Sequence, residues 1–266
     1  MSPHIVLAFD VYGTLLLTSS MAEKLAEYFG DEKAAKVAAD WRMLQLEYTW
    51  RWNSMEKYTS YSTITRSSLH HALSLSNLTL SPTATDALMT NYNSLSRFPD
   101  VSPAFSALRT TITTTSPNDQ HPITITPVIF SNGPISMLQA YLSSPPSLAP
   151  HADIFKKLIS VDEMPEGEKR YKPHPSVYEH LVKEMEVERG DVWLISGNPF
   201  DIVGANMYGL RTCWVDREGK GWVDRSVVEV EGKGRPDLIV HSLSDMVGRV
   251  TEWVEGKGKG GEGGRV

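Results

Sequence analysis

Four short segments of the chain carry polar side chains whose types could do chemistry together. Three of them end apolar, strand-like runs, and the fourth contains a Lys-Pro turn. The segments are AFDVYGTL (residues 8–15), VIFSNGP (128–134), YKPHPSVYE (171–179) and LISGNPFD (194–201). In an open parallel sheet, ligands bind just beyond the carboxyl ends of the strands. We therefore expect a single crevice that gathers two carboxylates, one ammonium group and several small hydrogen-bond donors.

Asp10 is the first candidate, because it ends the apolar run of residues 5–9 and precedes Gly13 and Thr14. A carboxylate in such a place can act as a nucleophile when neighbouring N–H groups and a cation hold it ionised. Taken alone, Asp10 fits a turn residue or a helix cap more often than a catalytic group.

The other three segments are also ambiguous when each is taken alone. The Ser-Asn-Gly sequence at 131–133 suits the binding of a small anion, but a plain strand-to-helix turn is the commoner role. Lys172 precedes Pro173, which favours an extended backbone and lets the ammonium reach a carboxylate, although most lysines are solvated. Asp201 follows a strand in a Pro-containing turn, where it also fits an acid at the start of a helix.

Composition narrows the function classes. The chain has 266 residues and a formal net charge of −6, which gives no reason to expect nucleic acid or an anionic membrane as a partner. Its one cysteine, Cys213, excludes an internal disulfide and fits a reducing compartment. The histidines show no metal-ligand spacing. No apolar run approaches the ~20 residues of a membrane span, and no N-terminal signal stands out, so we expect a cytoplasmic protein.

Two kinds of apolar spacing divide the chain. Over residues 98–255, short apolar runs alternate with helical patterns, which predicts an α/β fold with a doubly wound parallel sheet. Residues 17–97 show helical spacing and no convincing strand, which predicts a helical cap inserted after the first strand. We therefore expect a core domain of residues 1–16 and 98–255, a cap of residues 17–97, and a disordered, glycine-rich tail of residues 256–266.

Local signals predict where several elements begin and end. Gly30 is expected to end the first cap helix, and Ser81-Pro82 to begin another. The Ser- and Thr-rich stretch at 110–122 predicts an exposed loop. A helix is expected over residues 202–208, which would leave Asp201 in the turn before it.

The combination of motifs is far more specific than any one of them. The order Asp-x-Tyr-Gly-Thr (10–14), Ser-Asn-Gly (131–133), Lys-Pro (172–173) and Ser-x-Asn-x-x-Asp (196–201) resembles the haloacid dehalogenase superfamily. The version is most similar to the L-2-haloacid dehalogenases (type II). Two features carry this similarity. Trp41-Arg42 followed by QLEYTW (45–50) looks like that family's halide-site helix, and Tyr12 is the second feature. The resemblance implies a Rossmann-like core with a cap.

Tyr12 bears on the choice of reaction. Phosphatases of the superfamily carry a second Asp two positions after the nucleophile, which protonates the leaving alcohol. Here that position is Tyr12, whose unperturbed pKa of ~10 suits this task poorly. Halide is a good leaving group that needs no protonation, so Tyr12 is compatible with carbon–halogen cleavage and awkward for phosphate-ester cleavage.

The resemblance also implies roles for the reacting groups. Asp10 would attack C2 of a short 2-haloalkanoic acid and form an aspartyl ester. Arg42 would lie over the leaving halide. Asp201, with Ser196 and Asn198, would position and activate the water that hydrolyses the ester.

Further residues would support these groups, again by resemblance. Lys172 would keep Asp10 ionised, and Thr14 and Ser131 would help to hold the carboxylates. Tyr178 would support Lys172, and Asn132 would line the halide site.

The implied catalytic set is Asp10, Thr14, Arg42, Ser131, Lys172, Ser196, Asn198 and Asp201. The implied substrate-binding set is Val11, Tyr12, Leu46, Tyr61, Asn132, Tyr178 and Phe200, of which Val11, Tyr12, Leu46, Tyr61 and Phe200 would form an apolar wall. The chain departs from the family at Gly197, where Ser is common, at Phe200, where Trp is common, and at Tyr61, where Phe is common.

The resemblance implies a metal-independent hydrolase that needs no cofactor and takes a small 2-haloacid or related carboxylate, with no nucleic acid or membrane partner. A homodimer is compatible with it. One alternative is a Mg²⁺-dependent phosphatase of the same superfamily that uses Asp10 and Asp201. The other is a non-catalytic binding protein that keeps the fold, which the presence of every polar residue named above argues against.

Overall fold

The computed structural model describes residues 4–114, 123–226 and 233–256. Among these residues, six strands form one parallel sheet in the order β3-β2-β1-β4-β5-β6. This order and the helices on both sides confirm the predicted doubly wound sheet. The strands are β1 (His4–Phe9), β2 (Thr124–Ser131), β3 (Lys157–Ser160), β4 (Val192–Ser196), β5 (Arg211–Val215) and β6 (Leu238–Val240).

The register of the central strands places three candidate motifs at one edge. Phe9 of β1 pairs with Ile129 of β2 on one side and with Ile195 of β4 on the other. Asp10 comes directly after β1, and Ser196 is the last residue of β4. The chain order reverses between β1 and β4, and open α/β sheets bind their ligands at such a point.

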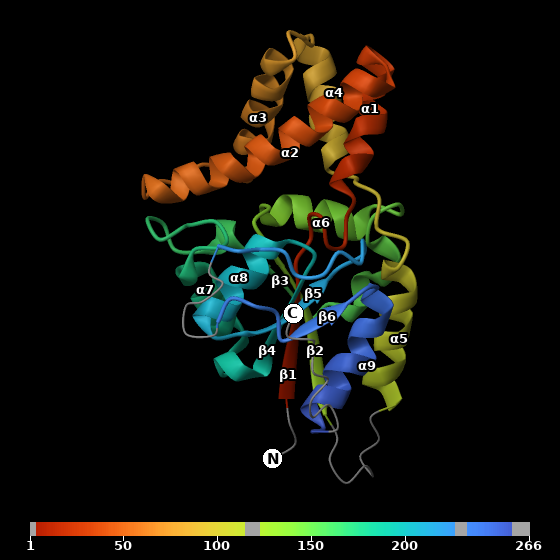
Figure 1. The fold of residues 1–266 in the computed structure, drawn as a ribbon, viewed down its shortest axis with the longest axis vertical. Coiled ribbons are helices and arrows are strands. Elements are labelled where there is room, and N and C mark those ends of the chain that lie inside the picture. The colour runs from red at the N-terminus through yellow and green to blue at the C-terminus, as the bar shows by residue number, and fades with distance from the viewer. Residues whose placement is uncertain (1–3, 115–122, 227–232, 257–266) are drawn as a thin grey trace.

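Helices cover the sheet on both sides, and a second group stands beyond its carboxyl edge (Figure 1). In this view α7 and α8 lie on one side of the sheet, and α5 and α9 lie on the other. The core helices are α5 (Val101–Thr114), α6 (Ile135–Ser143), α7 (Pro175–Met185), α8 (Pro199–Tyr208) and α9 (Leu243–Val254). The cap helices are α1 (Met21–Phe29), α2 (Asp31–Ser54), α3 (Tyr61–Leu75) and α4 (Pro82–Tyr92). Within the described ranges, no helix has the length and apolar character to cross a membrane.

Capping residues set the cap helices where the sequence predicts. Gly30 ends α1 with a φ of 75°, a left-handed value that glycine adopts without strain. Ser81 begins α4: its side chain accepts a hydrogen bond from the N–H of Ala84, and Pro82 occupies the first helical position. Both predicted boundaries are confirmed.

Two predicted boundaries are wrong. Residues 110–114 belong to helix α5 and not to a loop, and the remainder of that predicted loop, residues 115–122, lies outside the described residues. The hydroxyls of Thr110 and Thr111 donate to the carbonyls of Ser106 and Ala107, so these polar groups are satisfied within the helix. Helix α8 begins at Pro199, because proline is preorganised for a first helical turn.

Candidate active site

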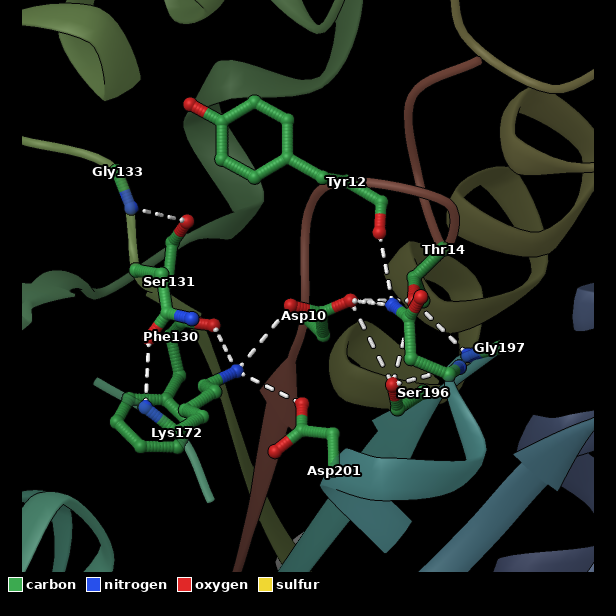
Figure 2. Close-up of polar contacts among 12 residues, drawn as sticks. Asp10, Tyr12, Thr14, Phe130, Ser131, Gly133, Lys172, Ser196, Gly197 and Asp201 are labelled. Atoms are coloured by element: carbon green, nitrogen blue, oxygen red, sulfur yellow. Dashed lines mark hydrogen bonds and ion pairs between the residues drawn. The ribbon is translucent and has the colours of Figure 1, made fainter. Parts of the chain in front are cut away.

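The carboxylate of Asp10 lies at the end of β1 and is surrounded by donors (Figure 2). Its Oδ2 accepts hydrogen bonds from Thr14 Oγ1 at 2.6 Å and from Asn198 Nδ2 at 2.8 Å. Its Oδ1 lies 3.2 Å from Lys172 Nζ. The residue is only 6% exposed. Hydrogen-bond donors and an ammonium group are the partners that a carboxylate nucleophile needs around it.

Lys172 connects the two acidic residues of the site. Its Nζ donates to Asp10, to Asp201 Oδ2 at 2.9 Å and to the carbonyl of Phe130 at 2.8 Å. The ammonium also lies 4.1 Å from the centre of the Phe130 ring, over its face. All three donor positions of the buried ammonium are thus used. The predicted pairing of Lys172 with Asp10 is present, and Asp201 joins it (Figure 2).

Asp201 lies in the first turn of α8 and is excluded from solvent. Its Oδ1 accepts from the Tyr178 hydroxyl at 2.8 Å, and its Oδ2 accepts from Lys172. Burial raises the pKa of Asp201 to about 6, with the charge of Lys172 opposing the rise and that of Asp10 adding to it. A carboxyl whose pKa lies near the working pH can accept a proton from water and release it again.

The loop after β4 meets the loop after β1 at a glycine. The N–H of Gly197 donates to Thr14 Oγ1 at 2.9 Å, which orients that hydroxyl toward Asp10. A Cβ on Gly197 would lie 2.6 Å from the carbonyl oxygen of Gly13. The two loops therefore approach too closely here to admit a side chain. Gly197, at a position where the family commonly has Ser, fits this close approach.

Ser196 and Asn198 turn toward Asp10 rather than Asp201. Ser196 Oγ lies 3.5 Å from Asp10 Oδ2 and accepts the N–H of Asn198 at 3.1 Å. Asn198 Nδ2 bonds both Asp10 and the carbonyl of Tyr12, the latter at 2.8 Å. Both residues thus contact Asp10, and their predicted part in positioning water stays a prediction.

The Ser-Asn-Gly segment at the carboxyl end of β2 contacts the main chain at Lys172. Ser131 Oγ accepts from the N–H of Gly133 at 3.1 Å, which leaves its hydroxyl proton free to donate. Asn132 Oδ1 accepts from the main-chain N–H of Lys172 at 2.9 Å. Asn132 thus contacts the lysine backbone, and its place at the halide stays a prediction.

Arg42 reaches the site from the cap helix α2. Its Nη1 donates to Gln45 Oε1 at 2.9 Å and to the Tyr61 hydroxyl at 3.2 Å. Its Nη2 lies 3.4 Å from both the carbonyl of Tyr12 and Asn198 Oδ1. The guanidinium is therefore placed over the loop that follows Asp10.

The aromatic residues predicted for the apolar wall belong to two ring pairs. Tyr12 stacks on Tyr61 with ring centres 5.1 Å apart, and Phe200 packs edge-on against Trp50 at 5.6 Å. Burial, together with Tyr141 and Tyr92 nearby, raises the pKa of Tyr12 well above its usual value, so its hydroxyl keeps its proton. Two more predicted wall residues differ in exposure: Val11 is buried and Leu46 is half-buried.

The profile of the haloacid dehalogenase-like hydrolase family matches residues 6–209. The protein belongs to this family. It is 30% identical over 238 residues to (S)-2-haloacid dehalogenase 2 of Pseudomonas sp. (strain CBS-3), covering 90% of this chain and 92% of that one. The solved L-2-haloacid dehalogenase of Xanthobacter autotrophicus gives a TM-score of 0.75 at 26% identity, over 92% of this chain and 98% of that one. A dehalogenase solved with an intermediate complex gives 0.76 at 26% identity, over 92% and 96%.

In this haloacid dehalogenase-like hydrolase, one predicted contact has a different partner. Tyr178 was expected to support Lys172, but its hydroxyl donates to the carboxylate of Asp201. The ring is fully buried, and Tyr178 is joined to Lys172 through the carboxylate of Asp201, which binds both side chains.

Sequence reasoning missed Arg217. Its Nη2 donates to the carbonyl of Thr14 at 2.8 Å, and its guanidinium binds both carboxylate oxygens of Asp100. Arg217 thus fixes the main chain of Thr14, the residue whose hydroxyl donates to Asp10. Its place two residues after a predicted strand, like that of the other site residues, is the signal that could have revealed it.

The site is built on hydrogen bonds and one ion-paired lysine. In the part of the chain that the structure describes, no group of three or more His, Cys, Asp or Glu side chains is arranged to hold a metal ion.

Proposed function

We propose that this protein hydrolyses the carbon–halogen bond of short 2-haloalkanoic acids through an ester on Asp10. The observation that carries the proposal is the set of donors around the Asp10 carboxylate, with Lys172 on one oxygen and Thr14 and Asn198 on the other. Its relatives support the same reaction, since they are named (S)-2-haloacid dehalogenases and haloacetate dehalogenase.

In the first step a carboxylate oxygen of Asp10 attacks C2 of the substrate. The new carbon–oxygen bond forms as the carbon–halogen bond breaks, and the halide leaves with the bonding electron pair. Arg42 lies over the same loop and supplies the positive charge that stabilises the departing halide. No proton is needed by the leaving group, which agrees with the retained proton of Tyr12.

In the second step water attacks the ester carbonyl of Asp10. Asp201 accepts one proton from that water, and the bond between the acyl carbon and the ester oxygen breaks. The second proton of the water passes to the leaving oxygen, so that a 2-hydroxy acid leaves. At neutral pH Asp201 is largely ionised, because its pKa is raised only to about 6. Asp10 returns as a carboxylate, and Asp201 releases its proton to solvent.

Metal independence is part of the proposal. Each carboxylate oxygen of the pair already accepts a hydrogen bond: Lys172 and Thr14 serve Asp10, while Lys172 and Tyr178 serve Asp201. A divalent cation would have to displace these donors to find oxygen ligands. This occupancy and the buried Tyr12 weigh against a Mg²⁺-dependent phosphatase.

We also propose the division of the chain into a core of residues 1–16 and 98–255 and a cap of residues 17–97. The two segments that join core and cap lie side by side, which supports these bounds. Leu16 forms an antiparallel bridge with Arg97, and the N–H of Leu17 donates to the carbonyl of Ser96 at 2.8 Å. A cytoplasmic location also remains a proposal, supported by a single cysteine, Cys213, in the sequence.

The deciding experiment traps the ester. The protein is mixed with 2-chloropropionate, quenched in acid and digested, and the peptide that contains Asp10 is examined by mass spectrometry. We expect an adduct of one propionate unit on Asp10, and none on Asp10→Asn, whose amide is a far poorer nucleophile. Halide release with no adduct, or an adduct that persists in a verified Asp10→Asn protein, would overturn the assignment.

A further inference from the structure

One amide side chain of the cap binds the main chain of the core beside Lys172. Asn53, at the end of α2, donates from Nδ2 to the carbonyl of Tyr171 at 2.7 Å. Its Oδ1 accepts from the N–H of the same Tyr171 at 2.8 Å. A side-chain amide that satisfies both polar groups of one residue replaces the hydrogen bonds that a neighbouring strand would otherwise supply.

One of these two hydrogen bonds holds the peptide unit that joins Tyr171 to Lys172. The carbonyl of Tyr171 and the N–H of Lys172 belong to one planar group. Asn53 of the cap binds the carbonyl end, and Asn132 of the core accepts the N–H end at 2.9 Å. The orientation of the plane is therefore set jointly by cap and core.

The ring of Tyr171 is held by the cap as well. It is fully buried, stacks on Tyr58 with ring centres 5.3 Å apart and lies 6.1 Å from Tyr61. Its hydroxyl donates to the carbonyl of Thr59. A core segment whose main chain and side chain are both bound by the cap cannot shift independently of it.

We propose that Asn53 is a positioning residue that holds the backbone at Lys172, so that the ammonium reaches Asp10 and Asp201 together only when α2 is in place. The reason is geometric: the ammonium is fully buried and joins two carboxylates at 3.2 and 2.9 Å. A small rotation of the peptide before Lys172 lengthens one of these contacts. The kinetic part of this proposal depends on the proposed dehalogenation, and its structural part does not.

The kinetic test compares Asn53→Ala and Asn53→Asp with Ser54→Ala, an exposed neighbour on the same helix end. We expect kcat for 2-chloropropionate to fall by about 10-fold or more in Asn53→Ala, because small misplacements of catalytic groups are costly, while KM changes little. Asn53→Asp should lose at least as much, since a carboxylate cannot donate to the Tyr171 carbonyl. Ser54→Ala should behave like the wild type.

The pH profile separates positioning from general damage. Asp201 faces Lys172, Asp10 and Tyr178, and the charge of Lys172 lowers its pKa. A displaced ammonium lowers it less, so the acid limb of kcat should move to higher pH in Asn53→Ala. A fall in kcat with an unmoved acid limb would overturn the proposal, as would a wild-type kcat.

A readout without turnover keeps the two proposals apart. The wild type and the variants are treated with an acylating reagent, and modification of Lys172 is quantified by peptide mass spectrometry. The buried, ion-paired amine should be protected in the wild type and in Ser54→Ala, and its labelling should rise several-fold in Asn53→Ala. If the wild type releases no halide, the dehalogenase proposal fails, and the labelling alone decides the role of Asn53. Equal labelling of the wild type, Ser54→Ala and Asn53→Ala would then reject it.

Discussion

The ammonium of Lys172 lies 2.9 Å from a carboxylate oxygen of Asp201, and both side chains are buried. The same ammonium also serves Asp10, so one positive charge faces two negative ones. A buried carboxylate is stabilised only by its partners, and here the partner is shared. This environment raises the pKa of Asp201 to about 6, chiefly by burial, with the charge of Asp10 adding to the rise and that of Lys172 opposing it. It also supplies the proton acceptor that ester hydrolysis requires.

Removal of the Arg42 guanidinium should slow the chemical step more than it weakens binding. We expect Arg42→Ala to lower kcat by about 10²-fold or more, because halide charge develops in the transition state. Halide release under saturating 2-chloropropionate measures this. Arg66→Ala is the matched control, since Arg66 is also a cap arginine but pairs with Asp86 at the surface. A change confined to KM would assign Arg42 to ground-state binding instead.

The acid limb of kcat should lie below pH about 6. Asp201 has a pKa of about 6 in the free enzyme, and the charge of Asp10 contributes to that rise. Once Asp10 is an ester, that charge is gone and the pKa of Asp201 falls. Activity should therefore be full above the limb and be lost as the pH drops and Asp201 takes up its proton.

A variant of Tyr178 tests the assignment of the acid limb of kcat to Asp201. Its hydrogen bond lowers the pKa of Asp201, so Tyr178→Phe should move the acid limb of kcat to higher pH. Tyr208→Phe changes a neighbouring ring, 6.1 Å away, and should leave the limb in place. Profiles of kcat against pH for the three proteins decide the matter, and coincident limbs would remove Asp201 from the role of base.

Chelation should not stop the reaction. Because the carboxylate oxygens of Asp10 and Asp201 are occupied by donors of the protein, halide release is expected to continue in excess chelator. Hydrolysis of an aryl phosphate with Mg²⁺ present should be slight. Robust phosphate release that stops on chelation, with no halide lost from any haloacid, would establish the phosphatase alternative.

Gly204 should tolerate no side chain. A Cβ there would lie 2.4 Å from Pro173 Cβ and 2.6 Å from the Tyr178 hydroxyl, so α8 would be pushed away from the Lys172 turn. We expect Gly204→Ala to lower the free energy of unfolding by about 1–3 kcal/mol through overpacking, and to lower kcat because α8 carries Asp201.

Gly248 supplies the matched control. It lies in helix α9, is exposed, and nothing lies within 4 Å of a Cβ built on it. Gly248→Ala should raise the free energy of unfolding by about 0.5–1 kcal/mol, since alanine loses less backbone entropy than glycine in a helix. Urea unfolding of both variants measures the difference, and equal effects would show that the contacts around Gly204 are unimportant.

Sequence patterns were reliable where the determining interactions are local. Gly30 and Ser81 ended and began helices as predicted, because capping involves residues two to four positions apart. The helix over residues 110–114 was missed because threonine is a weak helix former, and the packing of α5 overrides that weak preference.

Partners distant in the sequence could not be read from it. Tyr178 was assigned to Lys172 and contacts Asp201, while Asn198 was assigned to Asp201 and contacts Asp10. Each of these residues lies within reach of several charged groups in the same crevice. Differences of about an ångström choose among them, and no spacing in the chain encodes such differences.

The sequence by itself determined the alternation of strands and helices, the place of Asp10 at the end of the first strand, and the family. These follow from apolar periodicity and short motifs, which neighbouring residues carry. Only the tertiary structure decided that Asn53 binds Tyr171 across 118 positions, and that Arg217 binds Thr14 across 203. Asparagine and arginine are common surface residues, so nothing in their type marks them. The fold brings the end of α2 and the segment after β5 to the site, and with them Asn53 and Arg217.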